Sequence, residues 1–200
     1  MSNSKNKQNS QQEESLGKFI LDIVVMMVVI LGGYYLLFNF VLSNDRVSGP
    51  SMQPTFEDGD RLISVRNFEP RRDDIVILKA PKKANDPGAL YIKRIIGLPG
   101  DTVESKNDQM YINGKKMAQP FLNNSYKKKH TDPRNPYTNN FNIGSWISTK
   151  RKHVPQGHYF VMGDHRDVSS DSRRFGFVKR SEIIGQVKLR YWPFNQIQGF

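Results

Sequence analysis

The sequence contains no cysteine among its 200 residues. Disulfide bonds, thiolate metal sites and cysteine nucleophiles are therefore excluded. A chain without cysteine is compatible with an oxidising exterior, but redox chemistry does not identify its compartment. Its length is enough for one main domain with a modest insertion, and such a domain can bury a core without covalent cross-links.

Acidic residues are also scarce, with 19 Asp and Glu against 30 Lys and Arg and a formal net charge of +11. The two signs balance in residues 1–42, so the basic excess lies in the remainder of the chain. A basic surface can meet nucleic acid or anionic lipid headgroups. The lysine clusters, such as Lys127 to Lys129, lie in polar, turn-like sequence that is typical of solvated loops. We expect no nucleic-acid partner, and no motif supports a purely basic binding module.

One long apolar run, residues 19–42, stands out in this polar chain. At 1.5 Å per residue it can cross a hydrocarbon core of about 30 Å, so it predicts a transmembrane helix in a lipid bilayer. A cleavable signal peptide would have a shorter apolar region with a small-residue site after it. A buried helix of a soluble domain is the competing interpretation.

The charges around this run predict its orientation. Lys5, Lys7 and Lys18 precede it, whereas only Arg46 follows it closely. Positive charge favours the cytoplasmic side, so residues 1–18 are expected to form a cytoplasmic tail and residues 43–200 to lie outside. The polar composition of residues 1–17 predicts that they lack stable structure.

Helical periodicity is scarce after the apolar run, and short apolar stretches replace it. Turn residues bound each stretch, which predicts a mainly β domain. The stretches are residues 61–65, 75–78, 91–96, 157–162 and 183–192. Asn113-Gly114 predicts a two-residue hairpin turn within residues 110–117. Residues 123–140 are expected to form a long surface loop.

Ser51 lies between Pro50 and Pro54, directly after the apolar run, in a segment too rich in glycine and proline for a helix. A serine hydroxyl is a poor nucleophile until a nearby base removes its proton. The sequence offers two kinds of base: a histidine such as His165 in the stretch GDHRD, and a lysine whose pKa is lowered by burial.

Lys93 fits the second description. It lies in LYIKRIIG, where strand alternation places Tyr91, Lys93 and Ile95 on one face. Loss of hydration there would lower the amine pKa. A lysine in an apolar strand can instead extend its ammonium group to water, and a serine between prolines can be an ordinary turn residue.

Three stretches in order favour the catalytic interpretation. SMQPT at residues 51–55, YIKRIIGLPGD at 91–101 and GDHRDVSSDSRRFG at 163–176 resemble the signature boxes of the bacterial type I signal peptidases. The ending RYWPFN at 190–195 is similar to the last strand of that family. The arrangement of a single anchor before a compact domain is similar to that of the Gram-positive members. The resemblance therefore implies a location in the bacterial cell membrane.

The resemblance implies a membrane-bound serine endopeptidase that removes signal peptides from exported preproteins and needs no metal or cofactor. By motif position, Ser51 matches the nucleophile and Lys93 the general base. The resemblance further implies the following roles. Ser169 orients the lysine amine, Asp171 and Arg173 hold the site together, and Met52, Tyr91 and Ile92 line the substrate pockets.

The family fold is two antiparallel β-sheet regions behind one N-terminal transmembrane helix. The resemblance implies a catalytic core over residues 43–101 and 157–200, and an inserted region over residues 102–156. The predicted hairpin and loop fall within that insertion.

Three positions depart from the family pattern. His165 stands where the family usually has asparagine, Asp73 where a glycine is usual, and Gly49 where some members carry a hydroxyl that stabilises the oxyanion. Loss of one such hydrogen-bond donor can cost about 3 kcal/mol of transition-state stabilisation.

Two enzymatic or accessory alternatives stay open. One is a serine–histidine peptidase that uses His165 with Asp164, although neighbouring strand residues point to opposite faces. The other is a catalytically silent, signal-peptidase-like accessory factor in the assembly of surface fibres. Because both Ser51 and Lys93 are present, the sequence favours the active enzyme.

Overall fold

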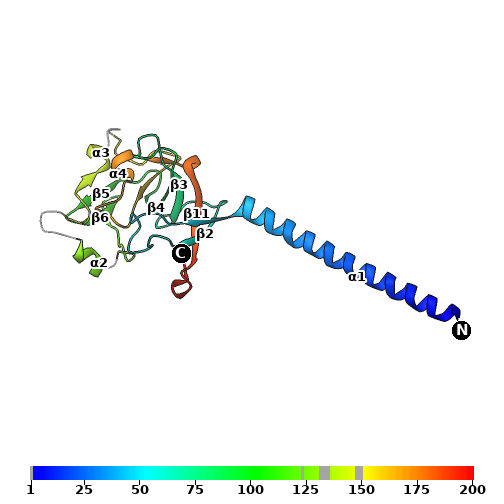
Figure 1. Cartoon of the computed structure of the whole chain (residues 1–200). Helices are drawn as coiled ribbons and strands as arrows, with labels where there is room; N and C mark the ends of the chain where they lie inside the picture. The colour runs from blue at the N-terminus through cyan, green and yellow to red at the C-terminus, as the bar shows by residue number, and fades with distance from the viewer. Residues whose placement is uncertain (1, 123, 131–135, 147–150) are drawn as a thin grey trace. The chain divides into compact units, whose positions relative to one another are not determined.

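The structure is a computed structural model that describes every residue except 1, 123, 131–135 and 147–150 (Figure 1). The chain forms two compact units, Met1–Leu42 and Ser43–Phe200. The first unit is one helix, and the second has its own apolar core.

The first unit is the helix α1 (Ser2–Leu36), which ends in a π-helical turn over Leu37–Val41. Residues Leu16–Val41 form a helix that is long and apolar enough to cross a membrane. The expectation that residues 1–17 lack stable structure is wrong, because α1 begins at Ser2. Residues 2–16 contain neither glycine nor proline, and extending an existing helix needs no new nucleus.

The second unit is built from two antiparallel sheets, as predicted from the apolar stretches and the family resemblance (Figure 1). The larger sheet runs, in spatial order, β1 (Leu42–Arg46), β2 (Arg61–Val65), β11 (Ile183–Trp192), β3 (Ile75–Lys79), β4 (Leu90–Gly97), β9 (His158–Met162) and β10 (Val178–Lys179), with β12 (Gln198–Gly199) beside β11. The smaller sheet runs β7 (Lys115–Lys116), β6 (Gln109–Ile112), β5 (Val103–Lys106) and β8 (Phe141–Asn142). All strands of the smaller sheet lie within residues 102–156.

Short helices join the strands. They are α2 (Asn124–Lys129), α3 (Ile143–Trp146), α4 (Ser172–Phe175), and 3₁₀ turns at Arg180–Glu182 and Phe194–Gln196. The prediction of a loop over residues 123–140 is wrong for α2, although residues 123 and 131–135 lie outside the described part. The last turn of α2 contains Lys127, Lys128 and Lys129. Positive charges there interact favourably with the negative end of the helix dipole.

The predicted hairpin is present between β6 and β7. Ile112 pairs with Lys115, which leaves Asn113 and Gly114 as the two turn residues. Their φ angles are 51° and 74°, as a type I′ turn requires. The Asn-Gly prediction is therefore confirmed.

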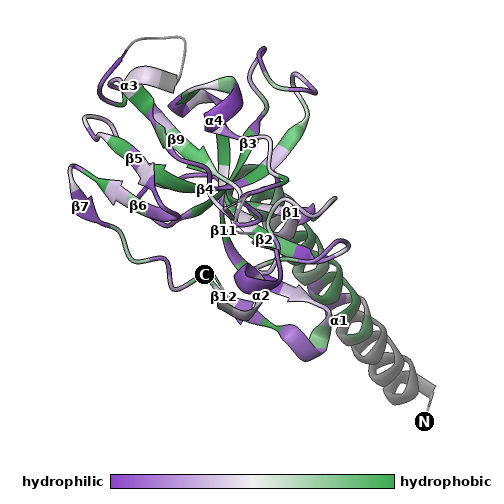
Figure 2. Ribbon diagram, turned by 90° about the vertical axis from the view of Figure 1, so that its left-hand side faces the viewer, coloured by the Kyte–Doolittle hydropathy of each residue, from purple (hydrophilic) through white to green (hydrophobic). Residues whose placement is uncertain are grey.

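Strand β4 lies in the middle of the larger sheet and is buried on both faces from Lys93 to Gly97. On one face Ile95 packs with Val76 of β3 and Val161 of β9. On the other, Ile96 joins apolar residues of the smaller sheet, including Val103. Figure 2 shows the hydrophobic residues gathered on β3, β4 and β9. A lysine in this strand is therefore carried into the interior.

Candidate active site

The nucleophile candidate Ser51 lies in a tight segment between β1 and β2. Gly49 adopts a φ of 82°, which L side chains rarely adopt, and its N–H donates to Asp58 Oδ1 at 2.9 Å. The Gln53 N–H donates to the Pro50 carbonyl at 3.0 Å, closing a turn around Ser51. Met52 is 1% exposed and packs into the apolar core beside Phe56. These contacts hold the Ser51 backbone rigidly.

Lys93 reaches this segment from the centre of β4. Its backbone pairs with Val76 of β3, and its side chain is only 3% exposed. Lys93 Nζ donates a hydrogen bond to Ser51 Oγ at 2.8 Å. The two residues that sequence reasoning proposed as base and nucleophile are thus in direct contact across 42 positions of sequence.

Burial sets the charge state of Lys93. Desolvation lowers the pKa of Lys93 to about 8. The carboxylates of Asp171 and Asp164 oppose that effect, and the positive charge of Arg173 adds to it. With this pKa, about a tenth of Lys93 is neutral at pH 7, far more than for an ordinary lysine, and the lone pair of the neutral form can accept a proton.

Asp171 and Arg173 form a buried ion pair near Lys93. Arg173 donates to the two Asp171 oxygens through Nε and Nη2, both at 2.8 Å. Asp171 also caps α4 by accepting the Arg173 N–H, and it accepts the Gly163 N–H at 3.0 Å. Burial alone would raise the pKa of Asp171, but the charge and hydrogen bonds of Arg173 hold it below its usual value. Asp171 is therefore a fixed buried anion near Lys93.

Gly163 allows this part of the site to close. A Cβ on Gly163 would overlap the Ser51 carbonyl and the side chain of Ser169. The His165 N–H also donates to the Ser51 carbonyl at 3.1 Å. Glycine is therefore required where the segment after β9 passes behind the nucleophile.

Ser169 is buried beside Gly163, at 3% exposure. Among the residues that the structure describes, its Oγ has no hydrogen-bond partner. The hydrogen bond from Ser169 to the Lys93 amine, which the resemblance implies, is not made in this conformation. The residue is nevertheless close to the Ser51 segment, so its orienting role stays a prediction.

The residues of the serine–histidine alternative are occupied elsewhere. The His165 ring contacts the Pro50 carbonyl through Nδ1 at 3.1 Å and the Tyr126 hydroxyl at 3.2 Å. Asp164 instead binds the Arg94 guanidinium at 2.9 and 2.6 Å. Within the described part of the chain, neither His165 nor Asp164 contacts the Ser51 hydroxyl, whereas Lys93 does.

Sequence reasoning missed the buried pair formed by Arg94 and Asp164. Strand alternation places Arg94 on the face of β4 opposite Lys93, but the local sequence pattern gives it no partner. In the structure, Thr55 Oγ1 also donates to Asp164 at 2.6 Å, and the Tyr137 hydroxyl donates to the Asp164 carbonyl at 2.6 Å. Asp164 thereby ties the nucleophile segment to β4. The sequence signal for this pair was Arg94 itself, a charged residue within an apolar strand.

A groove of about 490 Å³ runs over the two candidate catalytic groups. Its walls include the three residues predicted to line the substrate pockets, Met52, Tyr91 and Ile92. Met52 contributes from the buried floor, and the Tyr91 ring lies 5.1 Å from Lys93 Nζ. The groove therefore exposes a serine and an amine between the apolar side chains of Met52, Tyr91 and Ile92. The described residues include no cluster of three or more His, Asp or Glu that could hold a metal ion.

Fold and site together define a serine hydrolase built on β-sheets, and comparison with known proteins gives the family. The family model described as "Signal peptidase, peptidase S26" matches residues 20–192. Signal peptidase IB of Staphylococcus aureus is 35% identical over 192 residues, covering 93% of this chain and 94% of that protein. Signal peptidase I of Bacillus caldolyticus is 47% identical over 161 residues, covering 78% and 83%.

A solved structure agrees with these relatives. The crystal structure of a signal peptidase I from Enterococcus faecalis V583 has a TM-score of 0.54 and 39% sequence identity, and covers 60% of this chain and 97% of that one. The chain belongs to the signal peptidase family, peptidase S26. The prediction of the family and of a signal-peptidase type of enzyme is confirmed. These relatives give no support to a silent accessory factor.

Proposed function

We propose that this chain removes N-terminal signal peptides from exported preproteins, with Ser51 as nucleophile and Lys93 as general base. The observation that carries the proposal is the 2.8 Å contact between Lys93 Nζ and Ser51 Oγ, made by a lysine that is 3% exposed. A serine needs a base within hydrogen-bond reach, and a lysine needs burial to act as one at neutral pH.

The reaction proceeds in two steps. Neutral Lys93 takes the proton from Ser51 Oγ as that oxygen attacks the carbonyl carbon of the residue before the cut. The resulting ammonium then gives its proton to the leaving amine, so the mature protein departs and an ester joins the signal peptide to Ser51. Lys93 next deprotonates a water molecule that attacks the ester, and the returning proton restores Ser51.

Electrostatic support comes from around the two catalytic groups. The Ser51 N–H is one donor for the oxyanion, and preorganised donors of this kind lower the barrier most effectively. Asp171, fixed by Arg173, supplies the negative charge that stabilises the Lys93 ammonium between the two steps. Ser169 orients the amine in this proposal, which its buried Oγ supports by having no other hydrogen-bond partner among the described residues.

Substrate selection follows from the walls of the groove. Met52, Tyr91 and Ile92 leave room for small side chains at the residue before the cut and two residues earlier. The substrate chain lies extended beside a protein strand, with backbone hydrogen bonds and shallow pockets. Recognition of shape and small residues explains how one enzyme can process many preproteins.

Residues 19–42 anchor the enzyme in a bacterial cell membrane as a single span. The N-terminus is cytoplasmic and the catalytic unit extracytoplasmic, an orientation that the lysines before the span favour. Tethering enzyme and signal peptide to one membrane raises their effective concentration without a new contact. Protease added to intact, wall-stripped cells should digest the catalytic unit, and protection there with digestion in inverted vesicles would reverse the orientation.

The deciding experiment compares purified full-length chains on one preprotein. The wild type should release the mature protein with a new N-terminus at the predicted cut, and Ser51→Ala should not. Ser181→Ala, which changes an exposed serine in the 3₁₀ turn at Arg180–Glu182, is the matched control and should cleave like the wild type. Equal cleavage by Ser51→Ala would refute the assignment of the nucleophile.

A further inference from the structure

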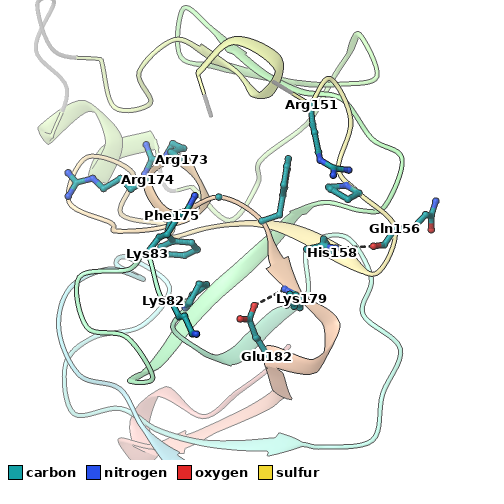
Figure 3. Close-up of a pocket in the computed structure, with 14 residues that line it drawn as sticks. Lys82, Lys83, Arg151, Gln156, His158, Arg173, Arg174, Phe175, Lys179 and Glu182 are labelled. Atoms are coloured by element: carbon teal, nitrogen blue, oxygen red, sulfur yellow. Dashed lines mark hydrogen bonds between the residues drawn. The ribbon is translucent and has the colours of Figure 1, made fainter. Parts of the chain in front are cut away.

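A second hollow, of about 1100 Å³, lies outside the catalytic groove and is lined mainly by basic side chains (Figure 3). They come from the turn after β3, from the segment before β9, from α4 and from β10. Its basic lining residues are Lys82, Lys83, Arg151, His158, Arg173, Arg174 and Lys179. Of these residues, only Arg173 has a part in the proposed reaction, where it fixes Asp171.

Its charges are largely uncompensated. Lys82, Lys83, Arg151 and Arg174 are exposed, and none makes an ion pair within the described residues. Among the described residues that line the hollow, Glu182 is the one carboxylate, and its Oε2 accepts the Lys179 N–H at 2.8 Å. Gathered like charges around a concave surface raise the positive potential and attract an anion.

The backbone under these charges is fixed. The turn that carries Lys82 and Lys83 is closed by hydrogen bonds from Ala80 N to Ala89 O and from Gly88 N to Ala80 O, at 2.8 and 2.9 Å. Ala84 of the same turn packs into the core. The buried bond between Asp171 and Arg173 holds α4, and therefore the Cα of Arg174, in place. The backbone that carries Lys82, Lys83 and Arg174 is thus fixed by hydrogen bonds and core packing.

Two aromatic rings in contact separate the hollow from the catalytic groove. Tyr91 lines the groove and Phe175 lines the hollow, with ring centroids 6.4 Å apart. Tyr91 in turn lies 5.1 Å from Lys93 Nζ, so the Phe175 ring is no more than about 11.5 Å from the proposed base. Tyr91 borders the cut itself, because it lines the pocket proposed for the residue before it. An extended chain covers about 3.3 Å per residue, so the hollow lies about three or four residues from the cut, whichever way the chain runs.

We infer that the basic hollow binds acidic side chains of the preprotein that lie about three to six residues after the cut. This inference rests on the proposed function. The hollow offers charge complementarity to carboxylates, and it lies within reach of a chain bound in the groove. Residues before the cut lead back into the apolar part of a signal peptide, where burying a carboxylate is costly, whereas residues after the cut enter water. The acidic segment therefore belongs to the mature protein.

Equilibrium binding to full-length Ser51→Ala in neutral detergent separates recognition from catalysis. The probes are two fluorescent peptides that span a cut site and differ only in carrying two aspartates or two asparagines at the fourth and fifth residues after it. The acidic peptide should bind about five- to tenfold more tightly, the order expected of two or three exposed ion pairs. The preference should shrink as salt is raised.

A triple substitution tests the hollow itself. Lys82→Gln, Lys83→Gln and Arg174→Gln together, in the Ser51→Ala background, should abolish the preference for aspartate and leave binding of the asparagine peptide unchanged. The matched control, Lys115→Gln, Lys116→Gln and Lys188→Gln, removes three exposed charges elsewhere and should keep the preference. Equal binding of the two peptides, or a preference retained by the hollow variant, would overturn the inference.

A membrane role gives a different result. If vesicles containing phosphatidylglycerol, compared with phosphatidylcholine alone, distinguish the hollow variant from its control while the peptides do not, the hollow binds lipid phosphate and the inference is wrong. Cleavage of the asparagine-bearing preprotein by the wild type tests the proposed function separately. Cleavage without an acidic preference refutes only the hollow, and an acidic preference without cleavage refutes only the peptidase assignment.

Discussion

Arg94 and Asp164, 70 positions apart, form a buried bidentate pair immediately behind the catalytic groove. Their side chains are 7% and 0% exposed. The Asp164 carboxylate also accepts a hydrogen bond from Thr55, four residues after the proposed nucleophile. The pair therefore links the nucleophile segment, β4 and the segment after β9.

Asp164→Asn should destabilise the protein strongly, because it leaves the Arg94 guanidinium as an unpaired buried charge. Breaking one side of such a pair costs about 3–5 kcal/mol of the free energy of unfolding. Thermal unfolding of the full-length chain in detergent measures the effect as a fall in Tm. Glu69→Gln, at an exposed position, is the control and should leave Tm unchanged. An unchanged Tm for Asp164→Asn would show that the pair is dispensable.

Features that depend on neighbouring residues could be predicted from the sequence, whereas contacts between residues far apart in the sequence mostly could not. The β4 strand and the Asn113-Gly114 turn are local patterns, so alternation and turn chemistry were enough to predict them. The contact between Lys93 and Ser51 needed three motifs read together. The partners of Arg94, and the turn of helix α2 within an expected loop, depend on tertiary packing that no local period encodes.

His165→Asn should retain most activity, because the His165 ring contacts Pro50 and Tyr126 and not the Ser51 hydroxyl. The backbone N–H that supports the Ser51 carbonyl is kept in this variant, and asparagine is the usual family residue. We expect kcat/KM to fall less than about tenfold, which is under about 1.4 kcal/mol of transition-state stabilisation. A loss as large as that of Ser51→Ala would contradict the serine–lysine assignment.

Preprotein variants should be selected by the size of the residue before the cut. Replacing alanine there with phenylalanine or lysine should lower kcat/KM by about 100-fold or more, because the groove between Met52, Tyr91 and Ile92 rejects added volume through steric clash. Serine at the same position should be tolerated. Mass spectrometry of the products checks whether cleavage moves to another site. Unchanged cleavage of the phenylalanine variant would contradict this view of the pocket.

Lys93→Met should stabilise the protein while abolishing its activity. Because the pKa of Lys93 is lowered to about 8 in the folded chain and is ordinary when unfolded, the folded state binds fewer protons between these values. The wild type is therefore penalised below about pH 8 by up to about 3 kcal/mol, and the penalty disappears as pH rises towards the ordinary lysine pKa. The Tm of Lys93→Met should exceed that of the wild type at neutral pH, and the gap should narrow at alkaline pH. An equal Tm at neutral pH would mean that Lys93 is not desolvated.

The strictest test of Lys93 separates a base from a buried charge. Arginine keeps the charge and approximate length of lysine but does not lose its proton in proteins. Lys93→Arg and Lys93→Ala should therefore be equally inactive in cleavage of a purified preprotein, even where both variants fold. In the wild type, kcat/KM should rise with pH through about 8, since only the neutral amine can accept the Ser51 proton. Substantial activity in Lys93→Arg, or a flat profile from about pH 6 to about pH 9, would exclude Lys93 as the base.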